Sequence, residues 1–123
     1  MISLRGISKE YTTGTQTARI LDELDFDVTE GDITVIRGPS GSGKSTLLNI
    51  LGLLDEPTGG EVRLDGKPVS FVDFDALATT RSRSLSFIFQ SFNLNPVLTA
   101  EENVMVPLMI RHDIPRKERE RRV

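Results

Sequence analysis

The chain contains no cysteine and no tryptophan, and it has only one histidine and one tyrosine. Without cysteine, neither a disulfide framework nor a cysteine-based metal site can form. No apolar run approaches the ~20 residues that a helix needs to cross a bilayer. The first residues, Met1 to Arg5, lack a basic stretch followed by a long apolar one, so they do not resemble a secretory signal. These absences predict a cytoplasmic protein whose role at a membrane, if any, depends on a partner.

The composition is that of an ordinary globular protein. Hydrophobic residues make up 37% and charged residues 27% of the 123 residues, which fits one folded domain or part of one. The formal net charge is −3, so the chain as a whole has no attraction for nucleic acid. We therefore expect no nucleic-acid partner.

Much of the first seventy residues shows the alternation of half-buried strands. Apolar residues alternate with polar ones at Ile2 and Leu4, at Leu24, Phe26 and Val28, and at Val62 and Leu64 before an Asp65-Gly66 turn and Val69. This pattern predicts a small antiparallel sheet with one solvated face. Residues Thr12 to Arg19 are interpreted as a polar loop, longer than a plain hairpin turn.

Two shorter segments have a different pattern. Residues 33–36 and 85–89 are apolar along nearly their whole length, which is typical of strands buried on both faces in a parallel sheet. Residues 46–54 are apolar nearly all round and predict a buried helix that ends before Pro57. The fold class is therefore α/β.

The second half predicts helices. Residues 73–83 are a candidate surface helix, and Thr99-Ala100-Glu101-Glu102 fits a capping box at the start of another helix. Pro107 is expected to interrupt or kink that helix. A charged helix begins at Pro115, and the chain stops at Val123 without a helix cap, so we expect it to be the N-terminal part of a longer domain.

The strongest motif follows the first buried segment and opens the apolar helix. Gly38, Gly43, Lys44 and Ser45 fit the pattern G-x-x-x-x-G-K-[ST], and Gly41 is an additional glycine. Glycines allow the backbone to point successive N–H groups into one concavity, and the positive end of the helix dipole faces the same place. This loop predicts a site for the phosphates of ATP with Mg²⁺.

Each polar residue of the loop has an expected role. Lys44 reaches the β- and γ-phosphates, the Ser45 hydroxyl is the expected Mg²⁺ ligand, and Thr46 donates to the α-phosphate. Ser40 and Ser42 contribute mainly their backbone N–H groups. The glycine spacing does not fit a dinucleotide-binding fold. Another P-loop enzyme, such as a kinase, stays open at this point, whereas the guanine-specific motif Asn-Lys-x-Asp of GTPases is absent.

With these motifs in view, the chain resembles the nucleotide-binding domain of ABC transporters over essentially its whole length. The resemblance is carried by Gly31 to Asn49, Pro57 to Val62, Leu64 to Gly66, Phe87 to Leu94 (which resembles the family's Q-loop) and Leu98 to Val104. The Q-loop segment and the Pro-Ser-Gly-Ser-Gly loop most resemble the subgroup that serves lipoprotein release, macrolide or antimicrobial-peptide export, and cell division.

The resemblance implies a P-loop NTPase core with a partial, mostly parallel sheet. An antiparallel β subdomain would occupy about 1–70, interleaved with the P-loop strand and helix 33–54. A surface helix, core strand and Q-loop would follow over 71–95, and a helical subdomain would begin over 96–123. It further implies a head-to-tail dimer with a second nucleotide-binding subunit, docked on a transmembrane permease at the inner face of the membrane.

The resemblance also implies roles for residues outside the loop. Gln90 would touch Mg²⁺ and the attacking water, and with Lys44 it would be a catalytic residue. Tyr11 would stack on the adenine. Phe92, Leu94 and the residues near Pro96 would line a groove for a helix of the permease. Taken alone, these residues would more often serve packing or end a strand.

Several family motifs have no counterpart in this sequence. The signature Leu-Ser-Gly-Gly-Gln is absent, and no apolar strand ends in Asp-Glu; Phe71 to Asp75 is too short. The sole histidine, His112, is interpreted as a solvated residue and not as the family's switch histidine. We therefore expect this chain by itself to hold ATP without hydrolysing it efficiently. The alternative is a non-catalytic nucleotide-binding or interaction module.

Overall fold

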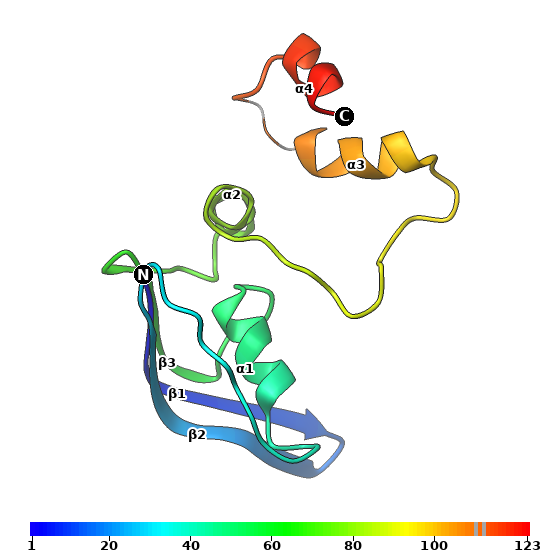
Figure 1. Cartoon of the computed structure of the whole chain (residues 1–123). Coiled ribbons are helices and arrows are strands. Elements are labelled where there is room, and N and C mark those ends of the chain that lie inside the picture. Colours follow the sequence, from blue (N-terminus) through cyan, green and yellow to red (C-terminus); the bar gives the residue numbers. More distant parts are fainter. Residues whose placement is uncertain (110, 112) are drawn as a thin grey trace. The chain divides into compact units, whose positions relative to one another are not determined.

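The computed structural model describes residues 1–109, 111 and 113–123. These residues form two units, Met1–Asp73 and Phe74–Val123 (Figure 1). Within the described ranges, no helix is both long enough and apolar enough to cross a membrane. The interpretation of His112 falls outside the described residues.

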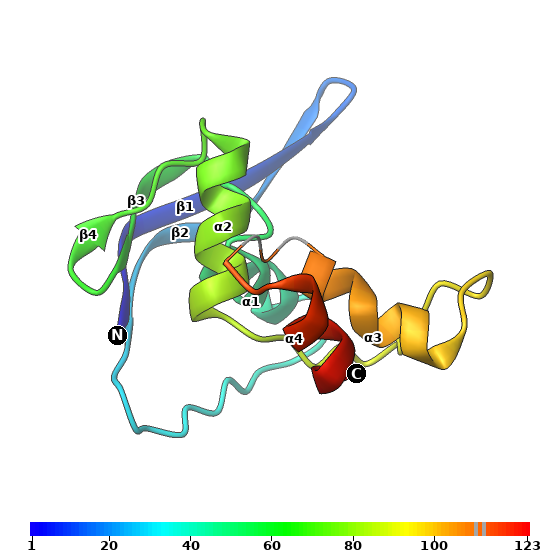
Figure 2. The same ribbon diagram turned by 90° about the horizontal axis from the view of Figure 1, so that it is seen from above.

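A four-stranded antiparallel sheet forms the base of the first unit, as the alternating sequence predicts. Strands β1 (Ile2–Thr13), β2 (Gln16–Val28), β3 (Gly59–Leu64) and β4 (Lys67–Pro68) lie in the order β2-β1-β3-β4 (Figure 2). Leu4 pairs with Phe26 on one side and with Val62 on the other. Because directly opposed residues share a face of the sheet, this register gathers apolar side chains on one side.

The loop interpretation of residues Thr12 to Arg19 is wrong. Strands β1 and β2 continue through this segment, and Thr13 pairs with Gln16 across a two-residue turn. Gly14 in that turn has φ +61°, which glycine adopts without strain. Arg19 forms ion pairs with Glu10 (2.8 Å) and Asp22 (2.7 Å) on the exposed hairpin. The polar side chains therefore belong to a solvated two-stranded ribbon. Such a ribbon has the same polar composition as a loop, so composition alone does not reveal the strand pairing.

Helix α1 (Lys44–Leu51) contacts β1 and β2 and completes the core of this unit. The fully buried side chains come from both layers: Leu4, Ile7, Ile50, Leu53 and Val62. The prediction of a helix over 46–54 that is buried all round is only partly correct, because Leu48 is 54% exposed and the helix ends at Leu51. A single sheet covers only one side of α1, so the side chains on its other side remain exposed.

The two predicted buried strands are not strands in this structure. Residues 33–36 and 85–89 have no regular secondary structure, and Ile33 and Ile88 are exposed. Figure 2 shows residues 29–40 as a trace without a neighbouring strand. A strand needs a neighbour to satisfy its N–H and C=O groups, and the four strands of the described sheet pair only with one another. The mostly parallel sheet is therefore absent from the described residues.

The second unit consists of the helices α2 (Phe74–Ser84), α3 (Ala100–Met109) and α4 (Arg116–Arg122). The predicted surface helix over 73–83 and the charged helix after Pro115 are thus confirmed. Pro107 lies inside α3 and does not interrupt it. Arginine side chains link the segments, since Arg111 donates to the Ser82 carbonyl (3.3 Å) and Arg119 to the Ile114 carbonyl (2.7 Å).

The capping box at the start of α3 forms as predicted. The Thr99 N–H donates to a carboxylate oxygen of Glu102 (2.8 Å), and the Glu102 N–H donates to the Thr99 hydroxyl (3.2 Å). We expect Thr99→Ala to destabilise this helix end by about 1 kcal/mol and to speed amide exchange at Glu102 roughly fivefold. Thr80→Ala in α2 removes a hydroxyl without removing a cap. An unchanged exchange rate at Glu102 in Thr99→Ala would show that the cap contributes nothing.

Candidate nucleotide-binding site

The glycine-rich loop occupies the region between residue 37 and helix α1, and its backbone takes conformations that suit glycine. Gly41 and Gly43 have φ of +80° and +85°. Gly43 is the N-cap residue of α1 and supplies no side-chain cap to the helix. The first backbone N–H groups of an α-helix have no intrahelical partner. Those of α1 are therefore available to an anion at this end.

Two glycines of the loop have close neighbours where a Cβ atom would lie. A Cβ atom at Gly38 would lie 2.6 Å from the Ser42 hydroxyl, so that hydroxyl would have to turn away. A Cβ atom at Gly43 would lie 3.1 Å from both Ile20 and Leu21 of β2. Gly38 therefore lies close to the Ser42 side chain of the same loop, and Gly43 lies close to β2.

Lys44, the first residue of α1, folds back over the loop. Its ammonium donates to the carbonyls of Gly38 (2.9 Å) and Pro39 (2.6 Å), and it lies 3.4 Å from the Ser42 hydroxyl. These acceptors are neutral, whereas a phosphate oxygen carries negative charge and adds a direct Coulombic attraction for the ammonium. A phosphate at the loop could therefore replace them as the partner of the ammonium.

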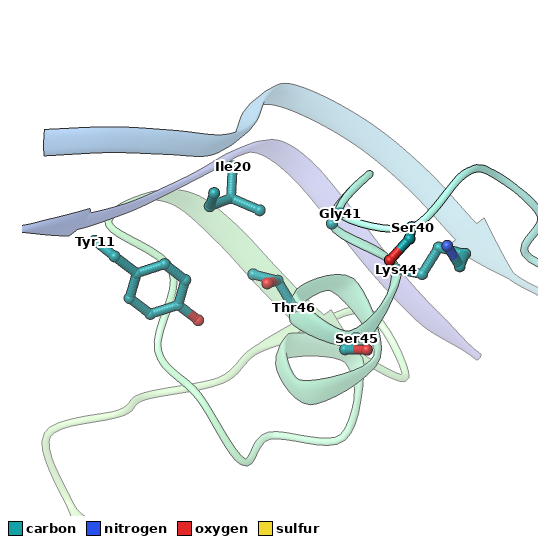
Figure 3. Close-up of a pocket in the computed structure, with 8 residues that line it drawn as sticks. Tyr11, Ile20, Ser40, Gly41, Lys44, Ser45 and Thr46 are labelled. Carbon is teal, nitrogen blue, oxygen red and sulfur yellow. The ribbon is translucent and has the colours of Figure 1, made fainter.

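A hollow of about 340 Å³ opens beside the loop. It is lined by Tyr11, Ile20, Ser40, Gly41, Gly43, Lys44, Ser45 and Thr46 (Figure 3). Every lining residue except Ile20 is among those singled out from the sequence. Gly38 and Ser42 belong to the loop but do not line the hollow. The structure thus brings the lone tyrosine of β1 to the loop, although more than twenty-five residues separate them in sequence.

Tyr11 contacts two residues, Asp55 and Lys9, that the sequence analysis did not single out. Its hydroxyl donates to Asp55 Oδ2 (2.7 Å), and the Lys9 ammonium bonds Asp55 Oδ1 (2.7 Å) and the Glu56 carbonyl (2.6 Å). The same ammonium lies over the Tyr11 ring, 5.0 Å from its centroid. Lys9 is nearly buried, whereas Tyr11 is 42% exposed. We call Lys9, Tyr11 and Asp55 the tyrosine cluster.

Hydrogen bonding shifts the pKa values within the tyrosine cluster in opposite directions. The bond to Asp55 raises the pKa of the Tyr11 phenol, burial adds to that increase, and the Thr46 hydroxyl opposes it. Burial raises the pKa of Asp55, but the bonds from Lys9 and Tyr11 outweigh it and leave that pKa below its usual value. The carboxylate is therefore ionised at neutral pH and accepts from both neighbours.

We expect Asp55→Asn to lower the pKa of Tyr11, because an amide stabilises the neutral phenol less than a carboxylate does. Tyr11 is the only tyrosine, so the absorbance of tyrosinate during an alkaline titration reports this group alone. Asp32→Asn, at an exposed position outside the tyrosine cluster, is the matched control. A phenol that titrates at the same pH in Asp55→Asn and in the unmodified chain would contradict the assigned bond.

The remaining predicted site residue, Gln90, belongs to the second unit and is exposed. Its role at the nucleotide stays a prediction. Among the residues that the structure describes, no group of three or more histidine and carboxylate side chains could hold a metal ion. The loop hydroxyls, above all that of Ser45, are the protein groups at the hollow that suit Mg²⁺, which prefers oxygen ligands and keeps several waters.

Comparisons with known proteins give related sequences over most of the chain. The lipoprotein-releasing system ATP-binding protein LolD of Anaeromyxobacter dehalogenans is 49% identical over 108 residues, which cover 88% of this chain and 45% of LolD. The macrolide export ATP-binding/permease protein MacB of Brucella abortus is 50% identical over 107 residues, which cover 87% of this chain and 17% of MacB.

The fold also matches a solved structure. The dimeric, post-hydrolysis structure of the ATP-binding cassette MJ0796, a protein of Methanocaldococcus jannaschii, bound to ADP and Pi, superposes with a TM-score of 0.88 at 42% identity. The match covers 99% of this chain and 53% of that one. The chain thus spans about half the length, or less, of these relatives. The ABC transporter family model matches residues 21–123, and the chain belongs to this family.

Proposed function

We propose that this chain is the ATP-binding part of an ABC transporter ATPase subunit, and that it holds Mg·ATP in the hollow beside α1. The observation that carries the proposal is that one hollow joins Tyr11 to the phosphate-binding loop. A nucleotide presents an aromatic base at one end and phosphates at the other. An aromatic side chain and a cationic, N–H-rich loop in one hollow match both ends.

The loop supplies charge and hydrogen-bond donors to the phosphates. Lys44 can exchange its carbonyl acceptors for phosphate oxygens. The first N–H groups of α1 have no intrahelical partner and carry the positive end of the helix dipole. Ser45 would be a ligand of Mg²⁺, which neutralises charge on the phosphates when it is bound. Thr46 would donate to the α-phosphate. Phosphoryl transfer depends mainly on such positioning and charge stabilisation.

The partners are proposed from the relatives. MJ0796 is dimeric in its solved structure, and MacB combines an ATP-binding part with a permease. We propose that the protein pairs head-to-tail with a second nucleotide-binding subunit and acts on a membrane permease from the cytoplasmic face, in export or lipoprotein release. In that assembly, residues 33–36 and 85–89 would be strands of a larger parallel sheet, because their sequences suit strands covered on both faces.

Calorimetric titration tests the binding proposal. We expect the chain to bind Mg·ATP and Mg·ADP, to bind inorganic tripolyphosphate more weakly, and to bind AMP least of all. The order follows from the two ends of the hollow, since AMP lacks the β- and γ-phosphates that Lys44 would contact and tripolyphosphate lacks the base. Equal binding of AMP and ATP, or no binding of any of these ligands, would contradict the proposal.

A second candidate function is a module that binds nucleotide without turnover. No apolar strand in the sequence ends in the Asp-Glu pair that the family uses for hydrolysis. An assay of phosphate release separates the two functions. Sustained hydrolysis that disappears in Lys44→Ala would rule out the non-catalytic module. Binding without phosphate release would favour it for this chain.

A further inference from the structure

The tyrosine cluster links Tyr11, at the end of the hollow proposed for the base, to the segment that follows the C-terminal end of α1. We propose that Asp55 is a positioning residue that fixes the Tyr11 ring for the nucleotide base, and that Lys9 in turn fixes Asp55. The inference rests on the proposed function, because it assigns the aromatic ring to the base of the bound nucleotide.

The Tyr11 ring needs such a support because it lies on an exposed strand. Tyr11 is 42% exposed and belongs to the part of β1 that extends into the solvated hairpin. A side chain there can turn about two torsion angles, and ordering it on ligand binding costs free energy. The bond from its hydroxyl to Asp55, 2.7 Å long, fixes the ring at its far end before a ligand arrives.

Asp55 is itself firmly placed. Both of its carboxylate oxygens accept a hydrogen bond, one from Lys9 and one from Tyr11. Lys9 is 9% exposed, and it also donates to the Glu56 carbonyl at 2.6 Å, so its ammonium is fixed at two points. The Asp55 N–H donates to the Asn49 carbonyl of α1 (3.3 Å). Asp55 is therefore bonded to β1 through its carboxylate and to α1 through its backbone.

Helix α1 consequently supports both ends of the hollow. Its first residue, Lys44, contacts the phosphate-binding loop, and the segment after its last turn holds the Tyr11 hydroxyl through Asp55. Figure 3 shows the Tyr11 hydroxyl directed toward the helix that carries Thr46. The spacing between the aromatic ring and the loop is thereby set by one rigid element, which favours a ligand that reaches both.

Lys9 also determines which face of the ring is available. Its ammonium covers one face of Tyr11 at 5.0 Å from the centroid, so a base can stack only on the opposite face. Stacking on an aromatic side chain tolerates any base. The tyrosine cluster therefore acts on affinity for the base, whatever its identity, and not on affinity for the phosphates.

Two probes separate these contributions: Mg·ATP, and Mg·tripolyphosphate, which has no base. Tyr11→Phe keeps an aromatic ring and leaves the Lys9–Asp55 ion pair intact, but it removes the bond to Asp55. We expect this variant to weaken Mg·ATP binding by about 3- to 10-fold while leaving tripolyphosphate binding within about twofold. Asp55→Asn should show the same selective loss to a smaller extent, and Asp32→Asn should show none.

Fluorescence gives a second readout that a purely structural role would not change. With one tyrosine and no tryptophan, the intrinsic emission of the chain comes from Tyr11. After correction for adenine absorbance, Mg·ATP should quench this emission, and Mg·tripolyphosphate should not. In free Asp55→Asn the emission should rise, because a hydrogen-bonded carboxylate quenches tyrosine.

The outcomes distinguish the two levels of the proposal. If the unmodified chain binds neither probe, the proposed function fails and this inference fails with it. If the chain binds both probes but Tyr11→Phe loses affinity for neither, or for both equally, only the positioning role of Asp55 is overturned. A selective loss for Mg·ATP in Tyr11→Phe supports the inference even if Asp55→Asn does not fold.

Discussion

Replacing Lys44 with alanine is expected to lower the affinity for Mg·ATP by about 10- to 100-fold. Hydrogen bonds to a charged partner are worth about 1.5–3 kcal/mol each, and each 1.4 kcal/mol changes a binding constant tenfold. The Lys44 ammonium already lies at the loop, where it bonds the carbonyls of Gly38 and Pro39. It therefore needs little rearrangement to reach a phosphate. Its removal should cost the full binding free energy of these charged hydrogen bonds.

The effect should be confined to binding. Alanine is the best helix former, so the start of α1 should remain intact in Lys44→Ala. Lys67→Ala, at an exposed lysine of β4, is the matched control for loss of one positive charge. Calorimetric titration of both variants with Mg·ATP and with Mg·tripolyphosphate should show a loss for both ligands in Lys44→Ala only. Unchanged affinity in that variant would remove Lys44 from the site.

Replacing Gly60 with alanine is expected to destabilise the first unit by about 2–5 kcal/mol. Gly60 in β3 has φ +88°, a conformation that costs other residues free energy. A Cβ atom there would lie 2.4 Å from the Gly6 carbonyl oxygen and 2.6 Å from that of Arg5. These are backbone atoms of β1, so β3 itself must move to make room. Small domains are stable by about 5–15 kcal/mol in total.

Gly66→Ala separates the cost of the positive φ from the cost of the clash with the backbone of β1. Gly66, in the turn between β3 and β4, has φ +77°, but nothing lies within 4 Å of its Cβ position. Gly66→Ala should lower the free energy of unfolding by only about 1 kcal/mol, the cost of a side chain at positive φ. Urea denaturation of both variants measures the difference in the free energy of unfolding. Equal destabilisation would show that the contact between β3 and the backbone of β1 is not the cause.

Local patterns were sufficient to predict the elements that are stabilised by near neighbours. The alternation of Leu24, Phe26 and Val28 predicts a half-buried strand, and β2 is one. The spacing of Thr99 and Glu102 predicts a capping box, and both of its hydrogen bonds form. In each of these cases, the partner lies a few residues away or on an adjoining strand, so a short window of sequence contains the physical cause.

The apolar segments 33–36 and 85–89 show the limit of such patterns. Their composition correctly describes residues that would be stable as covered strands, but a strand forms only when another strand is beside it. Composition does not supply that neighbour, and the described sheet pairs only β1 to β4. The hairpin over residues 12–19 shows the opposite case, since a polar segment became strand because its two halves pair with each other.

The candidate site was predictable where it is contiguous in sequence. The loop from Gly38 to Thr46 has a recognisable spacing, and the hollow lies beside it. Ile20, Lys9 and Asp55 were missed because each is an ordinary residue in its own segment. Asp55, for example, lies between the predicted helix over 46–54 and Pro57, where nothing in the local sequence indicates a site. Only the pairing of β1 with β2 and the packing of α1 place these residues around Tyr11.

The most direct test of the account follows the backbone amides of the isotope-labelled chain by NMR while Mg·ATP is added. The account predicts saturable shifts that are largest for the amides from Gly41 to Thr46, together with shifts at Tyr11, because one ligand spans the hollow. The same titration with Mg·tripolyphosphate should shift the loop amides and leave Tyr11 nearly unchanged. Saturable binding that leaves the amides of Gly41 to Thr46 unshifted would contradict the account.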